Sequence, residues 1–144
     1  MSKFPIKFEV SAIATPGVSL PWKSFTRDLP PIPVAIPPEL NGPGKAYSPE
    51  DLYGLAVLNC LFAVYKYLCE KNNIQFEKVE GKIIVTMDRN TENEELIISH
   101  LDITINISKP SDGSKAKELL EKTLKVCPIT NSIKTGKTCH INIL

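Results

Sequence analysis

The chain has 144 residues, of which 42% are hydrophobic, so it is long enough to bury a core as one domain and too apolar to be intrinsically disordered. Its 17 basic and 16 acidic side chains nearly cancel and form no long run of one sign, which gives no electrostatic reason to expect nucleic acid or an anionic membrane as a partner. The N-terminus lacks an apolar signal core, and the longest apolar stretch, 52–65, is shorter than the roughly 20 residues that span a bilayer. We therefore expect a cytoplasmic protein with a single domain over 1–144.

Strands and a proline-rich arm are expected over 1–47. Apolar and polar residues alternate over 4–12, which is the period of a strand with one face on a core. A turn and then a short return strand over 18–22 are expected next. The alternation over 32–36 indicates another strand, which Pro33 restricts to a sheet edge or to an irregular strand. We interpret the prolines of this part as stiffening an ordered arm rather than as marking a linker between domains.

A long central helix is predicted over 48–72. Ser48 suits the cap position, Pro49 suits the first helical position, and Asp51 can complete a capping box with Ser48. The middle of this helix is apolar nearly all round. Such a pattern indicates a helix that protein surrounds on most of its sides.

Two strands, a second helix and a closing strand are predicted in the rest of the chain. Alternation around a polar loop predicts a strand hairpin over 78–108. Apolar residues over 114–127 recur at the spacing of one helical face, so Cys127 is expected to point inward. Apolar and polar residues alternate again over 137–144, which predicts the closing strand. The order of elements indicates an α+β fold without the repeated βαβ units of a doubly wound sheet.

The four cysteines point to free thiols, metal ligands or redox chemistry rather than to a secreted disulfide scaffold. Cys60 and Cys127 lie in two different predicted helices, 67 positions apart, and could form a redox couple. Cys69 lies nine residues after Cys60, on nearly the opposite face of the helix, so these two cannot bridge, and we expect Cys69 to be structural. Cys139 and His140 point to opposite faces of a strand, which argues against a shared metal site.

Two interpretations stay open for each cysteine of the couple. Cys60 is either a small buried hydrophobe with a raised pKa, or a reactive thiolate that needs a cation or hydrogen-bond donor and an opening to solvent. Asn59 is a polar neighbour that could serve the thiol or make a packing hydrogen bond. Cys127 precedes Pro128, which ends or kinks the helix, so the thiol is either inward-facing and mobile or part of a plain helix terminus.

Glu50 and Arg27 are the charged candidates for the same site, and Lys23 is the alternative cation. The helix dipole favours an acid such as Glu50 in a first helical turn in any protein. Glu50 lies ten residues before Cys60, about 15 Å along the helix axis, so it could serve that thiol only from another subunit. Arg27 is an ordinary surface arginine unless the arm folds over the thiol.

Four short blocks of sequence form a specific pattern when taken together. They are PPELNG at 37–42, YSPEDL at 47–52, Asn59-Cys60, and CPITNSI at 127–133. From about Ile32 to the C-terminus, their order and spacing resemble the OsmC/Ohr family of osmotically inducible and organic hydroperoxide resistance proteins. The resemblance implies an intertwined homodimer, with two central helices wrapped by antiparallel sheets that take strands from both chains. The position of Arg27 fits neither main branch, which places the chain in an OsmC-like branch.

The resemblance also implies a chemistry. Cys60 would be the thiolate that reduces an organic hydroperoxide to an alcohol and becomes a sulfenic acid, which Cys127 would resolve as a disulfide. An external dithiol, dihydrolipoyl in the hydroperoxide branch, would reduce the pair again, with no bound cofactor or metal. Glu50 would hold the activating arginine, for which Arg27 is the candidate. The alternative is an OsmC-like stress protein that binds an apolar or thiol-reactive small molecule without efficient turnover.

Overall fold

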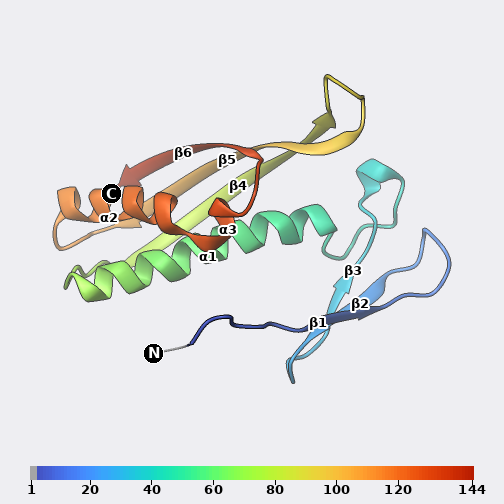
Figure 1. The fold of residues 1–144 in the computed structure, drawn as a ribbon, viewed down its shortest axis with the longest axis horizontal. Coiled ribbons are helices and arrows are strands. Elements are labelled where there is room, and N and C mark those ends of the chain that lie inside the picture. Colours follow the sequence, from blue (N-terminus) through green and yellow to red (C-terminus); the bar gives the residue numbers. More distant parts are fainter. Residues whose placement is uncertain (1–2) are drawn as a thin grey trace. The chain divides into compact units, whose positions relative to one another are not determined.

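Residues 3–144 are described by the computed structural model, and they divide into two compact units between Leu52 and Tyr53 (Figure 1). The first unit holds a three-stranded sheet, and the second holds another three-stranded sheet with its helices. The helix α1, Pro49–Lys71, begins in the first unit and continues through the second.

The sheet of the first unit is antiparallel, in the order β1-β2-β3. Its strands are β1 (Val10–Ile13), β2 (Trp22–Thr26) and β3 (Ile32–Val34), followed by the short 3-10 helix η1 (Pro38–Leu40). The return strand predicted over 18–22 is wrong, because the N–H of Leu20 donates to the carbonyl of Gly17 in a turn, and the strand starts only at Trp22. Pro33 lies in β3, the edge strand that the sequence predicted for it.

The apolar face expected of the first strand is not buried. Val10 is 76% exposed and Phe8 is 73% exposed. Among the hydrophobic residues of the first unit that the structure describes, those that are buried are Val34 and Ala35. The physical reason is that this unit contributes no helix of its own to cover one face of its sheet.

The sheet of the second unit has the order β4-β5-β6. Its elements are β4 (Lys78–Arg89), β5 (Leu96–Ser108), α2 (Gly113–Val126), α3 (Pro128–Asn131) and β6 (Gly136–Ile143). The predicted hairpin is confirmed, because β4 and β5 pair antiparallel. The α+β order without repeated βαβ units is confirmed, but the expectation of antiparallel sheets is wrong for one pair, because β6 runs parallel to β5. The two helices return the chain to the start of β5, where His100 pairs with Gly136, and such a crossover connection makes neighbouring strands parallel.

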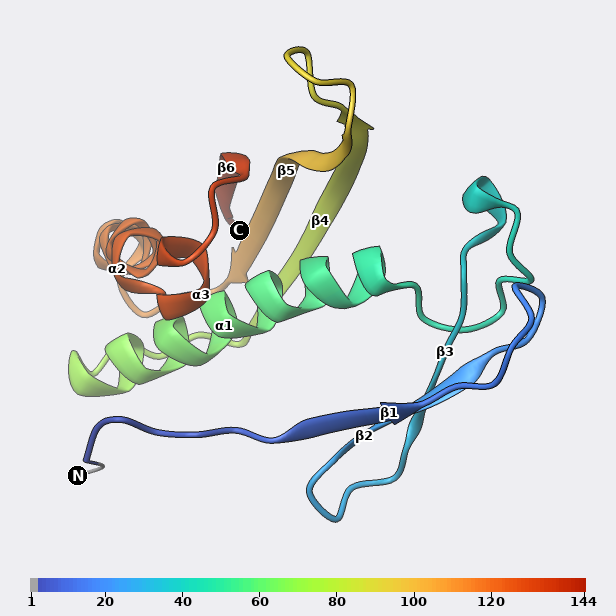
Figure 2. The ribbon, with the colours of Figure 1, turned by 45° about the vertical axis from the view of Figure 1, so that its right-hand side comes forward.

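The core of the second unit lies between one face of this sheet and the two longer helices (Figure 2). From Leu101 onward, alternate residues of β5 are fully buried there, namely Leu101, Ile103, Ile105 and Ile107. From α1, Val57, Leu61 and Tyr65 pack against them, and from α2, Leu119 and Leu120. Gly81 of β4 permits this close approach, because a Cβ atom at that position would lie only 2.7 Å from the Leu58 side chain.

The helix α1 starts at the predicted capping box. The N–H of Asp51 donates to Ser48 Oγ at 3.0 Å, and the N–H of Ser48 donates to Asp51 Oδ2 at 2.9 Å. The expectation that protein surrounds most of this helix is not met within one chain, because Leu55 is 40% exposed and Ala56 and Ala63 are exposed as well. By length and composition alone α1 could cross a membrane, a property that the core helices of soluble proteins share.

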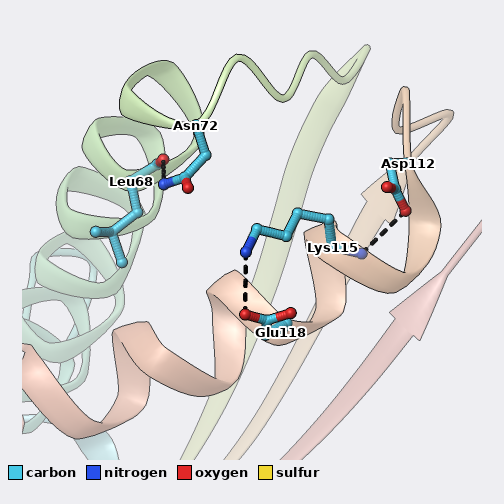
Figure 3. A network of polar contacts seen from close by, with 5 residues as sticks. All are labelled: Leu68, Asn72, Asp112, Lys115 and Glu118. Atoms are coloured by element: carbon cyan, nitrogen blue, oxygen red, sulfur yellow. Dashed lines mark hydrogen bonds and ion pairs between the residues drawn. The ribbon is translucent and has the colours of Figure 1, made fainter.

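Local hydrogen bonds also fix the facing ends of α1 and α2 (Figure 3). The Asp112 carboxylate accepts from the N–H of Lys115 at 3.0 Å and caps α2, as expected for an aspartate at that position. The Lys115 ammonium lies 3.0 Å from the Glu118 carboxylate, one turn along the helix. At the end of α1, the Asn72 side-chain amide donates to the carbonyl of Leu68 at 2.8 Å.

Candidate active site at Cys60 and Cys127

Two cysteines from distant parts of the sequence meet inside the second unit. The Cys127 Sγ lies 2.7 Å from the Cys60 Sγ, across a separation of 67 residues, and both are free thiols. Cys60 projects from the middle of α1, and Cys127 lies between α2 and α3. This approach is the one that a disulfide between the two residues requires.

The position of Cys127 follows from the proline after it. Cys127 has an extended backbone, with φ −64° and ψ 121°, because Pro128 disfavours helical geometry in the residue before it. Its N–H still donates to the carbonyl of Thr123, while its own carbonyl accepts from the N–H of Asn131 and from Thr130 Oγ1, each at 3.0 Å. The predicted break in the helix is therefore present, and the Cys127 side chain is fully buried at the break.

The Cys60 thiol is half-buried, and its hydrogen-bond partners are the Cys127 thiol and the N–H of Ile129. Burial is the main reason that the pKa of Cys60 is raised, and the Cys127 thiol raises it further through their hydrogen bond. The N–H of Ile129, at the start of α3, donates to the Cys60 sulfur and lowers the pKa in part. The net pKa of Cys60 is raised, so the second unit by itself favours the neutral thiol.

A hydroxyl pair near the cysteines was not anticipated from the sequence. Tyr53 Oη lies 2.6 Å from Thr135 Oγ1, which joins the second turn of α1 to the segment just before β6. Tyr53 lies seven residues before Cys60, so both side chains point to the same side of α1. The seven-residue spacing between Tyr53 and Cys60 is the one sequence feature that indicates a site residue here, but a tyrosine in an apolar helix is equally typical of core packing.

Other polar candidates lie apart from the sulfur pair. The Asn59 side chain is exposed and donates to the carbonyl of Leu55 at 2.8 Å, within its own helix. Cys69 is buried in the core, and burial raises the pKa of its thiol. In β6, Cys139 packs against the core, whereas His140 lies 3.4 Å from an Asp102 oxygen. Residues 3–144 contain no group of three His, Cys, Asp or Glu side chains that could hold a metal ion.

Both the sequence and the fold of this chain have counterparts among known proteins. A family model described as OsmC-like protein matches residues 42–142. The chain belongs to the OsmC-like family. No curated protein matches it.

Several solved structures share the fold of this OsmC-like chain. An OsmC-like protein of unknown function from Vibrio cholerae has a TM-score of 0.84 at 13% identity, over 95% of this chain and 99% of that one. An organic hydroperoxide resistance protein OsmC from Legionella pneumophila has a TM-score of 0.74 at 22% identity, over 98% of each chain. A putative organic hydroperoxide resistance protein from Vibrio cholerae, with captopril in one of its active sites, has a TM-score of 0.73 at 18% identity, over 99% of this chain and 95% of that one.

The charged residues expected at an OsmC-like site all belong to the first unit. Arg27 is exposed, has a positive φ of 51°, and holds its guanidinium carbon 5.7 Å from the centre of the Phe8 ring. Lys23 is exposed in β2. Glu50, in the first turn of α1, has one buried carboxylate oxygen, Oε1, without a hydrogen-bond partner in the described chain. The second unit thus holds the two thiols, and the first unit holds the candidate cations and the acid.

Proposed function

We propose that this OsmC-like protein is a homodimeric, thiol-dependent peroxidase that reduces organic hydroperoxides to alcohols. The contact between the Cys60 and Cys127 sulfurs, at 2.7 Å, carries the proposal. The similar structures support it, because some of them are named as organic hydroperoxide resistance proteins, including OhrB of Bacillus subtilis. A cytoplasmic location would supply the reducing conditions that such a thiol pair needs.

The proposed cycle uses the two thiols in turn. The Cys60 thiolate attacks an oxygen of the O–O bond, the alkoxide leaves and takes a proton to become the alcohol, and Cys60 becomes a sulfenic acid. The Cys127 thiol then attacks the Cys60 sulfur, which forms the disulfide and releases water. A dithiol such as a dihydrolipoyl group reduces the disulfide to two thiols and is itself oxidised to a disulfide. The apolar side chains around the pair favour an organic hydroperoxide over hydrogen peroxide.

Activation of Cys60 requires a positive charge, because its surroundings in the second unit raise its pKa. We propose that a second copy of the chain supplies this charge. The unpartnered Glu50 oxygen would accept from the Arg27 guanidinium and hold it over the thiol, with Lys23 as the alternative cation. Dimerisation would also cover the exposed apolar side of α1 and the exposed apolar residues of the first unit, so α1 would be an interface helix and not a membrane span.

Turnover of cumene hydroperoxide with dithiothreitol tests the proposal. Wild type is expected to consume the hydroperoxide, Cys60→Ser to show no turnover above background, and Cys127→Ser to accumulate a sulfenic acid that dimedone traps. Cys69→Ser is the matched control, because Cys69 lies in the core away from the pair, and it should keep its activity. Equal turnover by wild type and Cys60→Ser would eliminate the peroxidase.

The cation is tested in the same assay. Arg27→Gln should lower kcat/KM by about tenfold or more, as expected when the charge that stabilises a thiolate is lost. Lys23→Gln is the control, and it should keep the wild-type rate if Arg27 is the activating group. Loss of activity in the lysine variant alone would assign the role to Lys23 instead.

A second candidate function is the binding of an apolar or thiol-reactive small molecule without efficient turnover. The raised pKa of Cys60 favours it, because a neutral thiol reacts slowly with peroxides. Captopril in an active site of the similar protein from Vibrio cholerae gives a probe for it. Slow oxidation of Cys60 by peroxide, together with a rise in melting temperature on adding captopril, would support binding over catalysis.

A further inference from the structure

The segment that carries Cys127 is tied to α1 by a hydrogen bond at its far end. Thr135 lies eight residues after Cys127, and its Oγ1 is 2.6 Å from Tyr53 Oη. Tyr53 and Cys60 project from the same side of α1, about 10 Å apart along the axis. The segment 128–135 therefore lies along α1 between two contacts. The sulfurs of Cys127 and Cys60 meet just before its start, and the hydroxyls of Thr135 and Tyr53 meet at its end.

Other hydrogen bonds of this segment do not anchor its side chains to α1. Thr130 Oγ1 donates to the carbonyl of Cys127, and Ser132 Oγ donates to the carbonyl of Pro128, so both bonds lie within the segment. Among the described residues 3–144, the Tyr53–Thr135 bond is the one side chain to side chain hydrogen bond between α1 and 128–135, apart from the sulfur contact. Removing it leaves the start of the segment tied to α1 by the N–H of Ile129, which donates to the Cys60 sulfur, and leaves the Thr135 end without a side-chain bond to α1.

We propose that Tyr53 is a positioning residue for the resolving step, which it serves by holding the segment 128–135, and with it Cys127, against Cys60. The proposal rests on the proposed function, since it concerns the fate of the Cys60 sulfenic acid. The Tyr53 hydroxyl is bonded to Thr135 and acts through that residue.

Two reactions compete for the sulfenic acid. The Cys127 thiol attacks the Cys60 sulfur, which forms the disulfide and releases water. Alternatively, a second hydroperoxide transfers one oxygen to the sulfenic acid, which gives a sulfinic acid and an alcohol and ends the cycle. The first reaction depends on how often Cys127 is in contact with Cys60, and the second depends on the hydroperoxide concentration. A looser segment shifts the outcome toward the sulfinic acid.

The partition of the Cys60 sulfenic acid between disulfide and sulfinic acid can be measured. The reduced protein is titrated with cumene hydroperoxide, and both products are quantified by mass spectrometry. Tyr53→Phe should lower the hydroperoxide concentration that gives half sulfinic acid by about threefold or more, the effect of one lost hydrogen bond. Thr135→Val should do the same, and the double variant should match either single variant, because all three lack the same bond. An unchanged partition in Tyr53→Phe would overturn the proposal.

Tyr65→Phe is the matched control for stability. Tyr65 Oη donates to the carbonyl of Ala116 at 3.2 Å, so this change also removes a hydrogen bond from α1, but one to the start of α2. It should leave the partition unchanged. An equal shift in Tyr65→Phe would overturn the proposal, because general loosening would then explain the effect.

Equilibration with oxidised and reduced dithiothreitol separates this inference from the peroxidase. In this exchange the two protein thiols become the disulfide as oxidised dithiothreitol becomes its dithiol, so no peroxide is needed. Tyr53→Phe should lower the equilibrium constant for forming the Cys60–Cys127 disulfide by about threefold or more, whether or not the protein turns over hydroperoxides. If cumene hydroperoxide leaves Cys60 unmodified, the peroxidase fails, and this equilibrium alone decides the role of Tyr53. Equal constants for Tyr53→Phe and wild type would overturn it.

Discussion

The two units of the chain contain sheets of the same number of strands but differ in what those sheets bury. The sheet β4-β5-β6 packs α1 and α2 on one face, and alternate residues of β5 are fully buried. The sheet β1-β2-β3 has no helix of its own unit on either face, and the alternating apolar residues of β1 stay exposed. The comparison teaches that a period-two pattern specifies a face of a sheet, while burial requires another layer.

The same division separates the chemistry. All four cysteines belong to the second unit, whereas Arg27, Lys23 and Glu50 belong to the first. Within its own unit the Cys60 thiol has a raised pKa. The second unit, whose sheet is covered by helices, therefore holds the sulfur pair, and the first unit, with its exposed apolar surface, holds the charged residues that we propose for its activation.

The largest effect on the free energy of unfolding is expected from a substitution in the core of the second unit. Leu61→Ala should lower the free energy of unfolding by about 2–5 kcal/mol, because Leu61 is fully buried and its loss leaves a cavity. Leu55→Ala, on the exposed side of the same helix, should cost less than about 1 kcal/mol in folding. Urea denaturation at one low protein concentration measures both, and equal losses would break the distinction between the two sides of α1.

An intermediate effect, on dimerisation, is expected in the first unit, where the exposed apolar face of β1 would be covered in the proposed dimer. Val10→Lys should leave the far-ultraviolet circular dichroism of the chain unchanged but raise the dimer dissociation constant by about tenfold or more, since a charge would enter an apolar interface. Ser11→Lys, on the opposite face of the same strand, is the control and should change the constant less. Sedimentation equilibrium measures both variants. A dissociation constant that Val10→Lys leaves unchanged would mean that this face is not the interface.

The smallest expected effect is a loss of stability at alkaline pH, caused by thiols that all lie in the second unit. Burial raises the pKa values of Cys60, Cys69 and Cys139 above the ordinary thiol value of about 8.5. A raised folded-state pKa gives stability that is fully present below the unfolded pKa and is lost as the pH rises through the folded pKa. The free energy of unfolding should therefore fall more steeply above about pH 8.5 in wild type than in Cys69→Ala. Parallel curves for the two proteins, measured by urea denaturation at several pH values, would contradict this.

Much of the local structure could be predicted because its causes lie within a few residues of one another. The capping box of Ser48 and Asp51, the edge position of Pro33, the β4–β5 hairpin and the break of the helix at Cys127 all follow from short-range geometry. The strand predicted over 18–22 was wrong, because the hydrogen bond from the N–H of Leu20 to the carbonyl of Gly17 keeps these residues in a turn, and β2 starts only at Trp22.

Long-range features of the sheet could not be predicted from the pattern. The alternation in β6 is the same for a parallel and an antiparallel neighbour, so only the path of α2 and α3 decides its direction. The Tyr53–Thr135 bond joins residues 82 positions apart, and neither residue carries a local signal for the other.

The sequence alone determined where α1, α2, β6 and the β4–β5 hairpin form and that Cys127 faces inward, because periodicity, capping and the geometry of residues next to proline act over a few residues. Its four short blocks also carry the resemblance to the OsmC/Ohr family. Only the tertiary structure decided that the two sulfurs lie 2.7 Å apart and that the pKa of Cys60 is raised, because both depend on which side chains from distant segments share the core.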